Sequence, residues 1–257
     1  MKISVITINY NTGTEFLRTK ESVLSQTYNN LEWVVVDGGS EDESMDEILR
    51  SRELIDILII EKDRGISHAF NKGINIATGD ALIFLNSGDT FSRADALQDI
   101  FQAWNMNDKG WICGGGYIVD EDSLSVKREL GKHSPESLIQ NGCKIFHASV
   151  LIRTDLIRSF GGYSESYKSA MDFDLWVRLI SRGFEPQIWH GIISEFHLGG
   201  ISGAYSGYEE EIRSLEHNGM LRYSSRIRMA LRKYLTSNLS FLKKNKYVYQ
   251  IKELIAL

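Results

Sequence analysis

Short apolar runs alternate with helix-like segments over the first hundred residues, and this alternation restricts the fold more than any other feature of the sequence. The runs typical of buried strands are Ile3–Ile8, Leu31–Val36, Ile55–Ile60 and Ala81–Leu85. The segments between them that carry apolar residues at helical spacing are Glu15–Ser25, Ser44–Arg50 and His68–Ile76. This order predicts an α/β fold, in which a mostly parallel sheet has helices on both faces.

The alternation of apolar runs and helix-like segments becomes less regular after Asp89. The spacing predicts helices over Ala94–Trp104 and Asp172–Arg182, and strands over Trp111–Val119 and His147–Ile152. We therefore expect a nucleotide-type half that ends near residue 110 and a less regular half after it.

Composition bounds the class of protein. The chain has 257 residues, of which 42% are hydrophobic and 25% charged, as in ordinary soluble globular proteins. Its two cysteines, Cys113 and Cys143, have no CxxC spacing, and reduced thiols in a cytosolic protein are the expected state. The apolar run Ile3–Ile8 is too short for a signal peptide, and no stretch approaches the roughly 20 apolar residues of a membrane-spanning helix. We expect a cytoplasmic protein, or one that lies against the inner face of the plasma membrane.

Charge is divided unevenly along the chain. From Arg222 to Leu257 there are nine basic residues and one acidic residue, a net charge of +8, so the total of -5 leaves -13 on the rest. This segment also carries leucines such as Leu231 and Leu235, which makes it amphipathic. Two interpretations stay open: a solvated helical extension that closes the fold or a homodimer, and a peripheral contact with an anionic membrane. We expect no nucleic-acid partner.

Carboxylates follow the predicted strands. Asp37 follows Leu31–Val36, Asp89 follows Ala81–Leu85 after the turn residues 86–88, and Asp172 and Asp174 come later. Open α/β sheets bind ligands at the carboxyl ends of their strands, so these acids suggest a site for a polyphosphate held through a metal ion. A dinucleotide fold is disfavoured, since residues 9–13 contain a single glycine where G-x-G-x-x-G is needed, and no P-loop is present.

Five blocks together resemble a known family, the family 2 glycosyltransferases of the GT-A fold, and within it the bacterial branch that builds colanic-acid-like exopolysaccharides. The blocks are Ser4–Asn11, Trp33–Asp42, Asp63–Gly73, Phe84–Asp89 and Met171–Arg178, in order and at family-like spacing. The resemblance implies a Rossmann-like, mostly parallel central sheet flanked by helices. It divides the chain into a glycosyltransferase domain (1–220, with a nucleotide-binding half 1–110 and an acceptor half 111–220) and a basic amphipathic helical tail (221–257).

The resemblance also implies a reaction. A sugar would move from a nucleoside-diphosphate sugar, UDP favoured, to a saccharide acceptor linked to a polyprenyl diphosphate, with inversion at the anomeric carbon. Such a hexosyltransferase would serve exopolysaccharide, capsule or O-antigen biosynthesis.

Donor binding is expected from residues in the first half. The carboxylate of Asp37 can accept N–H hydrogen bonds from a nucleobase, although an acid before Gly38-Gly39 is also a common turn residue. Asp63 is expected near the nucleoside and Arg64 on phosphate oxygens. For Asn71 and Lys72 an exposed helix surface is an equal alternative. The full expected set is Asn9, Asp37, Asp63, Arg64, Asn86 and Gly88.

By the resemblance, Asp89 coordinates Mg²⁺ or Mn²⁺, hard cations that prefer oxygen ligands. Residues 86–89, Asn-Ser-Gly-Asp, keep only one of the two or three acids usual in this motif. His197 is the expected second protein ligand, with a purely structural histidine as the alternative. The glycine loop after it is expected to act as a lid over bound donor.

The matching acid before a helix is Asp172, which is expected to take the proton of the acceptor hydroxyl as general base. Asp174 should point elsewhere, and Leu175 and Trp176 should be core. His147 is expected on the acceptor side.

Two other functions compete with this one. The first is a non-catalytic sugar-nucleotide-binding subunit, which is compatible with a metal motif that keeps only one acid. A general base such as Asp172 argues against it, because a binding module needs no base. A sugar-phosphate nucleotidyltransferase would need a glycine- and basic-rich loop after the first strand, and none is present.

Overall fold

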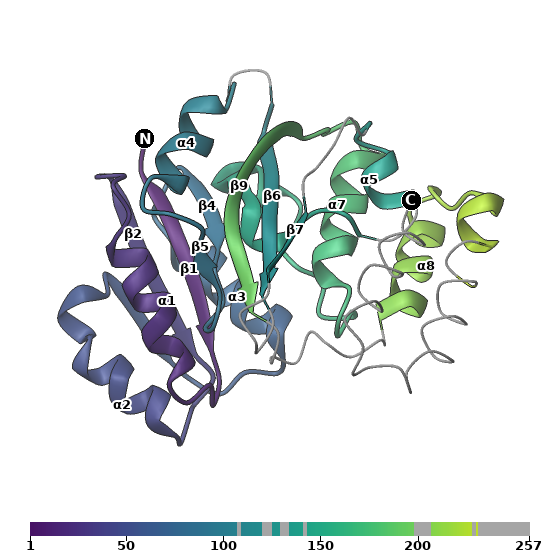
Figure 1. The fold of residues 1–257 in the computed structure, drawn as a ribbon. Helices are drawn as coiled ribbons and strands as arrows, with labels where there is room; N and C mark the ends of the chain where they lie inside the picture. Colours follow the sequence, from purple (N-terminus) through teal and green to yellow (C-terminus); the bar gives the residue numbers. More distant parts are fainter. Residues whose placement is uncertain are drawn as a thin grey trace.

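A sheet of nine strands forms the centre of the computed structural model, which describes residues 1–106, 109–119, 125–128, 134–140, 143–197, 207–227 and 230 (Figure 1). The spatial order is β3-β2-β1-β4-β8-β6-β9-β5, and β7 pairs with β6. The strands are β1 Ile3–Asn9, β2 Leu31–Asp37, β3 Ile57–Ile60, β4 Ala81–Phe84, β5 Thr90–Phe91, β6 Trp111–Val119, β7 Ser125–Arg128, β8 Val150–Arg153 and β9 Gln187–His197.

The first four strands are parallel. β1 pairs with β2 on one side and β4 on the other, and β3 adds to β2. Side chains of these strands alternate between two apolar clusters: Val34 and Val36 of β2 face one, while Trp33 and Val35 face the other. A strand buried on both faces reads as a continuous apolar run, and for this reason the sequence signal here was strong.

The second half of the sheet is mixed. β8 is antiparallel to both β4 and β6, whereas β6 and β9 are parallel. The short strand β5, directly after the turn at 86–89, is antiparallel to the end of β9, with Thr90 opposite Glu195. This pairing brings the last residues of β9 back to the edge at which β1 and β4 end, as the arrowheads of β6 and β9 indicate (Figure 1).

Helices cover both faces of the sheet. Buried residues of α1, α2 and α4 belong to one apolar cluster, and those of α3, α6, α7 and α8 to the other. Their bounds are α1 Glu15–Leu24, α2 Glu43–Arg50, α3 Ile66–Ile76, α4 Ala96–Ala103, α5 Ser137–Gln140, α6 Thr154–Ser159, α7 Met171–Ser181 and α8 Gly207–His217, with short 3-10 turns over Arg52–Leu54 and His147–Ser149. Among the described residues, no helix combines the length and the apolar character needed to cross a bilayer.

The predicted α/β architecture is confirmed, and two of its details are wrong. His147–Ser149 form a 3-10 turn rather than the start of a strand, and the strand covers Val150–Arg153. The predicted strand at residue 55 begins at Ile57, because a 3-10 turn occupies Arg52–Leu54. The glycine loop after His197 and nearly all of the predicted basic tail lie outside the described residues. The proposed boundary at residue 110 falls within one continuous sheet and stays a prediction.

Candidate active site at the carboxyl ends of the parallel strands

A pocket of about 800 Å³ opens at the edge where β1, β2 and β4 end. Parallel strands bring their carboxyl ends to the same edge, so loops from distant parts of the sequence meet there. The lining residues that the argument below uses are Asn9, Tyr10, Glu15, Gly38, Asp63, Asn86, Ser87, Gly88, Asp89, Met171 and His197. A volume of this size suits a ligand as large as a nucleotide derivative.

The turn over residues 86–89 forms one wall of the pocket. Gly88 has a φ of +99°, which favours glycine, and a Cβ atom there would lie 3.0 Å from Oε2 of Glu15. The hydroxyl of Thr19 in α1 holds the turn: Oγ1 accepts a bond from the N–H of Gly88 and lies 2.8 Å from the carbonyl oxygen of Asp89. The turn is thus fixed from α1 before any ligand binds.

Asp89 is buried in this wall, with 5% of its surface exposed. Burial raises the pKa of Asp89 to about 8; the backbone N–H of His197 opposes this shift, and the nearby charge of Glu15 adds to it. Burial makes the ionised form of this carboxylate unfavourable unless a cation binds beside it, so Asp89 is well suited to bind a cation.

His197 ends β9 directly beside Asp89. Burial, and then the charge of Arg18, lower the pKa of His197, so its ring is neutral at pH 7. Within the described part of the chain, its Nε2 atom is buried without a hydrogen-bond partner, as are Oδ1 of Asn86 and Oγ of Ser87. Three orphaned polar atoms at one pocket wall indicate that the site is completed by a polar ligand.

The residues present fit a divalent cation that takes most of its ligands from elsewhere. No group of three or more His, Cys, Asp or Glu side chains that could hold a metal occurs among the described residues. The carboxylate oxygen of Asp89 suits Mn²⁺ or Mg²⁺, and the imidazole nitrogen of His197 favours the transition metal Mn²⁺ over Mg²⁺. A ligand diphosphate and water would have to supply the remaining positions.

Asp172 lies in the first turn of α7, next to Met171 of the pocket lining. Its Oδ1 atom accepts a hydrogen bond of 2.7 Å from the backbone N–H of Phe173, which fixes the carboxylate against the helix N-terminus. The side chain keeps some contact with solvent, yet burial raises the pKa of Asp172 to about 6. A carboxyl group with this pKa is ionised at neutral pH and can accept a proton.

Asp174 points away from the pocket, as expected. It is buried in an ion pair with Arg178 (2.7 Å between Oδ2 and Nε) and accepts a hydrogen bond from Ser214. Leu175 and Trp176 are fully buried, and Trp176 stacks on Trp111.

Asp37 does not line the pocket. Its carboxylate is fully buried and accepts four hydrogen bonds: from Asn9 Nδ2 (2.7 Å), from the N–H groups of Gly39 (2.8 Å) and Ser40 (2.7 Å), and from Ser40 Oγ (2.7 Å). Since a carboxylate has about four acceptor positions, none is left for a nucleobase in this geometry. The direct contact expected of Asp37 therefore has no support from the structure, and Asp37 supports the loop together with Asn9.

Asp63 and Arg64 separate in the structure. Asp63 lines the pocket beside Gly38, and Lys72 fixes it with 2.8 Å between Nζ and Oδ1. Lys72 also donates to the carbonyl oxygens of Glu61 and Lys62. Its side chain therefore holds this loop in place and is not simply part of an exposed helix surface. Arg64 turns outward and forms a forked pair with Glu165 at 3.1–3.2 Å, away from the expected phosphate.

His147 lies below the pocket rather than in its lining. Its ring packs against Phe70 and Phe84, its Nε2 atom lies 2.8 Å from the hydroxyl of Tyr163, and burial lowers its pKa to about 4. This position is that of a core support, and the acceptor-side role stays a prediction. Asn71 likewise has a structural role, because it binds both backbone groups of Tyr163.

Tyr10 and Glu15 are among the lining residues that the sequence did not indicate. Tyr10 is 59% exposed and lies beside Gly38, as Asp63 does, and Glu15 lies over Gly88. Tyr10 belongs to the block Ser4–Asn11, in which only Asn9 is an expected donor-binding residue. Nothing in the sequence pattern marked Glu15, which stands at the start of an ordinary amphipathic helix.

Solved structures with this architecture define the class. The structure of residues 1–349 of S. aureus TarS in complex with UDP-GlcNAc matches with a TM-score of 0.63 and 18% identity. The match covers 96% of this chain and 75% of the TarS chain. The mannosyltransferase PcManGT from Pyrobaculum calidifontis, in complex with GDP-Man and Mn²⁺, matches with a TM-score of 0.66 and 16% identity over 99% and 84%. These likenesses identify the fold as GT-A-like.

The sequence identifies the family. The model "Glycosyl transferase family 2" matches residues 4–161, which is more than half of the chain. A "PGL/p-HBAD biosynthesis glycosyltransferase" of Mycobacterium bovis is 28% identical over 189 residues, covering 71% of this chain and 72% of that protein. The chain belongs to glycosyl transferase family 2. The predicted family is thereby confirmed, and the colanic-acid branch stays a prediction.

Proposed function

We propose that this glycosyltransferase moves a sugar from a nucleoside-diphosphate sugar, UDP favoured, to a saccharide acceptor with inversion at the anomeric carbon. The observation that carries the proposal is the pocket itself. One wall holds Asp89, His197 and the orphaned polar atoms of residues 86 and 87, and another part of the lining, Met171, adjoins Asp172. A site for a diphosphate thus has a carboxylate that can accept a proton next to its lining.

The nucleoside fits the part of the pocket around Gly38. The Tyr10 ring and the Asp63 carboxylate both lie beside Gly38, about 3.0–3.1 Å from where a Cβ atom of residue 38 would be. An aromatic ring can stack on a base, and a carboxylate can accept its N–H groups. Asp63 therefore takes over the base contact that the sequence had suggested for Asp37, which is already saturated by its loop.

The diphosphate fits the wall formed by the turn at 86–89. Oγ of Ser87 can donate to a phosphate oxygen, whereas the space beside Gly88 is filled by the Glu15 side chain. A divalent cation bound at Asp89 and His197 would act as a Lewis acid toward the leaving diphosphate.

The proton leaves through Asp172. As the acceptor oxygen forms its bond to the anomeric carbon, the bond from that carbon to the diphosphate oxygen breaks, and the hydroxyl proton passes to the Asp172 carboxylate. Attack from the face opposite the leaving group inverts the anomeric centre and needs no covalent sugar–enzyme intermediate. The pKa of about 6 keeps Asp172 ionised before the reaction.

The named relatives support the donor class. Two structures of the same fold hold UDP-GlcNAc, or GDP-Man with Mn²⁺. We carry these over as a nucleoside-diphosphate sugar and a divalent cation only. The polyprenyl-diphosphate-linked acceptor and a role in exopolysaccharide, capsule or O-antigen assembly rest on the sequence resemblance. A peripheral membrane contact through residues 221–257 rests on their charge, and salt-sensitive binding to anionic vesicles would test it.

A donor panel tests the proposal. Thermal unfolding is measured with UDP-, GDP- and TDP-sugars, with and without Mn²⁺; a ligand at 100 times its Kd stabilises by roughly 2.7 kcal/mol. Release of nucleoside diphosphate is then followed with the stabilising donor and a saccharide acceptor. Stabilisation without any release would favour the alternative, a non-catalytic binding subunit. The small number of acids at the cation site among the described residues supports that alternative. Neither stabilisation nor release with any donor would refute the proposal.

A further inference from the structure

Helix α7, which carries Asp172, begins without a capping side chain at its N-cap position. That residue is Ala170, which forms no capping bond, and within the first turn Asp172 itself accepts a bond from the N–H of Phe173. Alanine is among the poorest residues at this position, because it cannot accept a bond from the free N–H groups of the first turn. The local sequence thus leaves the start of the helix in need of an outside partner.

Glu210 of α8 holds the three residues that lead into this helix start. Its carboxylate accepts hydrogen bonds from three consecutive backbone N–H groups, those of Lys168 (3.0 Å), Ser169 (2.9 Å) and Ala170 (3.0 Å). Burial alone would raise the pKa of Glu210, but these bonds outweigh it and lower the pKa below its ordinary value. Glu210 is therefore an anion at neutral pH, which strengthens each bond.

Other residues of α8 hold the same segment. Arg213 donates to the carbonyl oxygen of Ser166 (2.8 Å) and lies over the ring of Tyr167, with 4.6 Å from the guanidinium carbon to the ring centre. Ser214 donates to Asp174 (2.9 Å). The contacts of α8 therefore lie on both sides of Asp172, and none of the bonds described here touches Asp172 itself.

The orientation of Asp172 depends on this segment. Its carboxylate is held by the N–H of Phe173, within the first turn of α7, so a shift of residues 168–170 would carry the carboxylate with it. Misplacement of a catalytic group by about 1 Å can cost 100-fold in rate. We infer that Glu210 is a positioning residue that holds the backbone leading into α7 and thereby fixes the Asp172 carboxylate toward the acceptor.

This inference rests on the proposed function, in which Asp172 is the base. It predicts an effect on turnover and none on the donor, because Glu210 does not line the pocket. Glu210→Gln keeps the size of the side chain and places an amide NH₂ against N–H donors. We expect kcat to fall by about 10- to 100-fold while the donor Kd stays within about 2-fold.

A matched control lies on the same helix. Glu216 is exposed and pairs at the surface with Arg226 at 3.6 Å, so Glu216→Gln should leave both kcat and donor Kd unchanged. A double-mutant cycle with Asp172→Asn then separates positioning from general support. If Glu210 acts through Asp172, Glu210→Gln should cost less than about 3-fold in the Asp172→Asn background. An equal loss in both backgrounds, or a parallel loss of donor binding, would overturn the inference.

A second readout does not depend on the reaction. Hydrogen exchange of peptides covering residues 166–172 should be faster in Glu210→Gln than in the wild type and unchanged in Glu216→Gln. Unchanged exchange in both variants would overturn the inference, since Glu210 would then not stabilise residues 168–170. If the wild type transferred no sugar from any donor, the proposed function would fail, whereas the exchange result would still decide whether Glu210 holds residues 168–170.

Discussion

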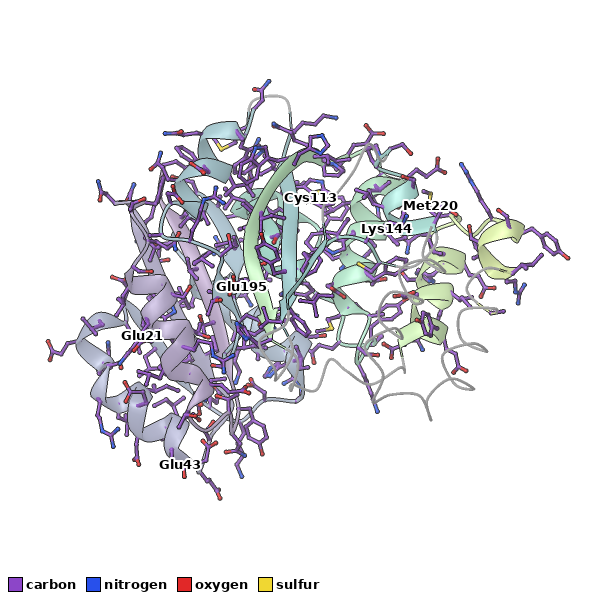
Figure 2. All side chains as sticks on the ribbon, in the orientation of Figure 1. Glu21, Glu43, Cys113, Lys144, Glu195 and Met220 are labelled. Carbon is purple, nitrogen blue, oxygen red and sulfur yellow. The ribbon has the colours of Figure 1, made fainter. Side chains whose placement is uncertain are left out.

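The backbone N–H of His197 donates a hydrogen bond to the carboxylate of Asp89, which joins the last residue of β9 to the turn that follows β4. The two residues are more than a hundred positions apart in the sequence. The pairing of Thr90 with Glu195 brings them together, and Figure 2 shows Glu195 near the arrowhead of β9. An acid and an imidazole thus belong to the same pocket wall.

Removal of either group should weaken cation binding. Asp89→Asn removes the charged oxygen ligand. His197→Ala removes the Nε2 atom, which has no hydrogen-bond partner among the described residues. We expect each to reduce Mn²⁺ affinity in the presence of UDP by at least about 10-fold, measured by electron paramagnetic resonance of free Mn²⁺. Glu21→Gln, on the exposed side of α1 (Figure 2), is the control and should bind as the wild type does. Wild-type affinity in both site variants would place the cation elsewhere.

Asp172→Asn should remove the base while keeping the side-chain volume. The Asn side chain cannot take the acceptor proton, so kcat should fall by roughly 10²–10⁴. Donor affinity, measured by calorimetry with the nucleoside diphosphate, should stay near that of the wild type, because Asp172 is not in the pocket lining. Full turnover in this variant would show that another group accepts the proton.

The pH dependence of kcat/KM should report the same carboxyl group. Because the pKa of Asp172 is raised to about 6, the carboxyl is protonated below that pH and cannot act as base. We expect kcat/KM to fall as the pH drops through about 6. The assay is run with saturating Mn²⁺, because the pKa of Asp89 is also raised, to about 8, and a bound cation would hold that carboxylate ionised. His147, with its pKa lowered to about 4, stays neutral over this range and cannot produce the limb. A profile with the same midpoint in the residual activity of Asp172→Asn would contradict the assignment.

The parallel half of the fold could be predicted because its strands are buried on both faces. Val34–Val36 and Ala81–Phe84 have no exposed residue, so composition alone marked them. The two-residue strand Thr90–Phe91 gave no such signal, since its burial comes entirely from pairing with β9. Helix α8 was also missed, because its first turn is acidic and its apolar stripe is narrow.

Within the candidate site, the sequence predicted which loops meet but not which side chains face the pocket. Asp37 and Asp63 both follow strands, and only the hydrogen bonds around them decide that the first is saturated and the second lines the pocket. Glu210 could not have been found from sequence, because its partners are backbone N–H groups some forty residues away. Such contacts leave no residue pattern.

Arg64→Ala should leave donor affinity within about 2-fold of the wild type. The Arg64 side chain is 69% exposed and paired with Glu165 outside the pocket, and exposed pairs contribute little. Calorimetric titration of the stabilising nucleoside diphosphate would measure this, with Glu165→Gln as the matched control. A loss of 10-fold or more in Arg64→Ala alone would indicate that the guanidinium turns inward to the phosphates, as the sequence had suggested.

Substitution of Asp37 and Asp63 should separate loop support from ligand binding. Asp37→Ala leaves the buried N–H groups of Gly39 and Ser40 without acceptors, and each such group costs about 1–3 kcal/mol, so the free energy of unfolding should fall by about 2–5 kcal/mol in urea titrations. Asp63→Asn weakens a largely buried pair with Lys72 and so should also lower stability, but it should in addition reduce donor affinity. If Asp37→Ala folded with wild-type stability and lost only donor binding, Asp37 would be the base contact after all, and the four hydrogen bonds around it would have to rearrange when the nucleotide enters.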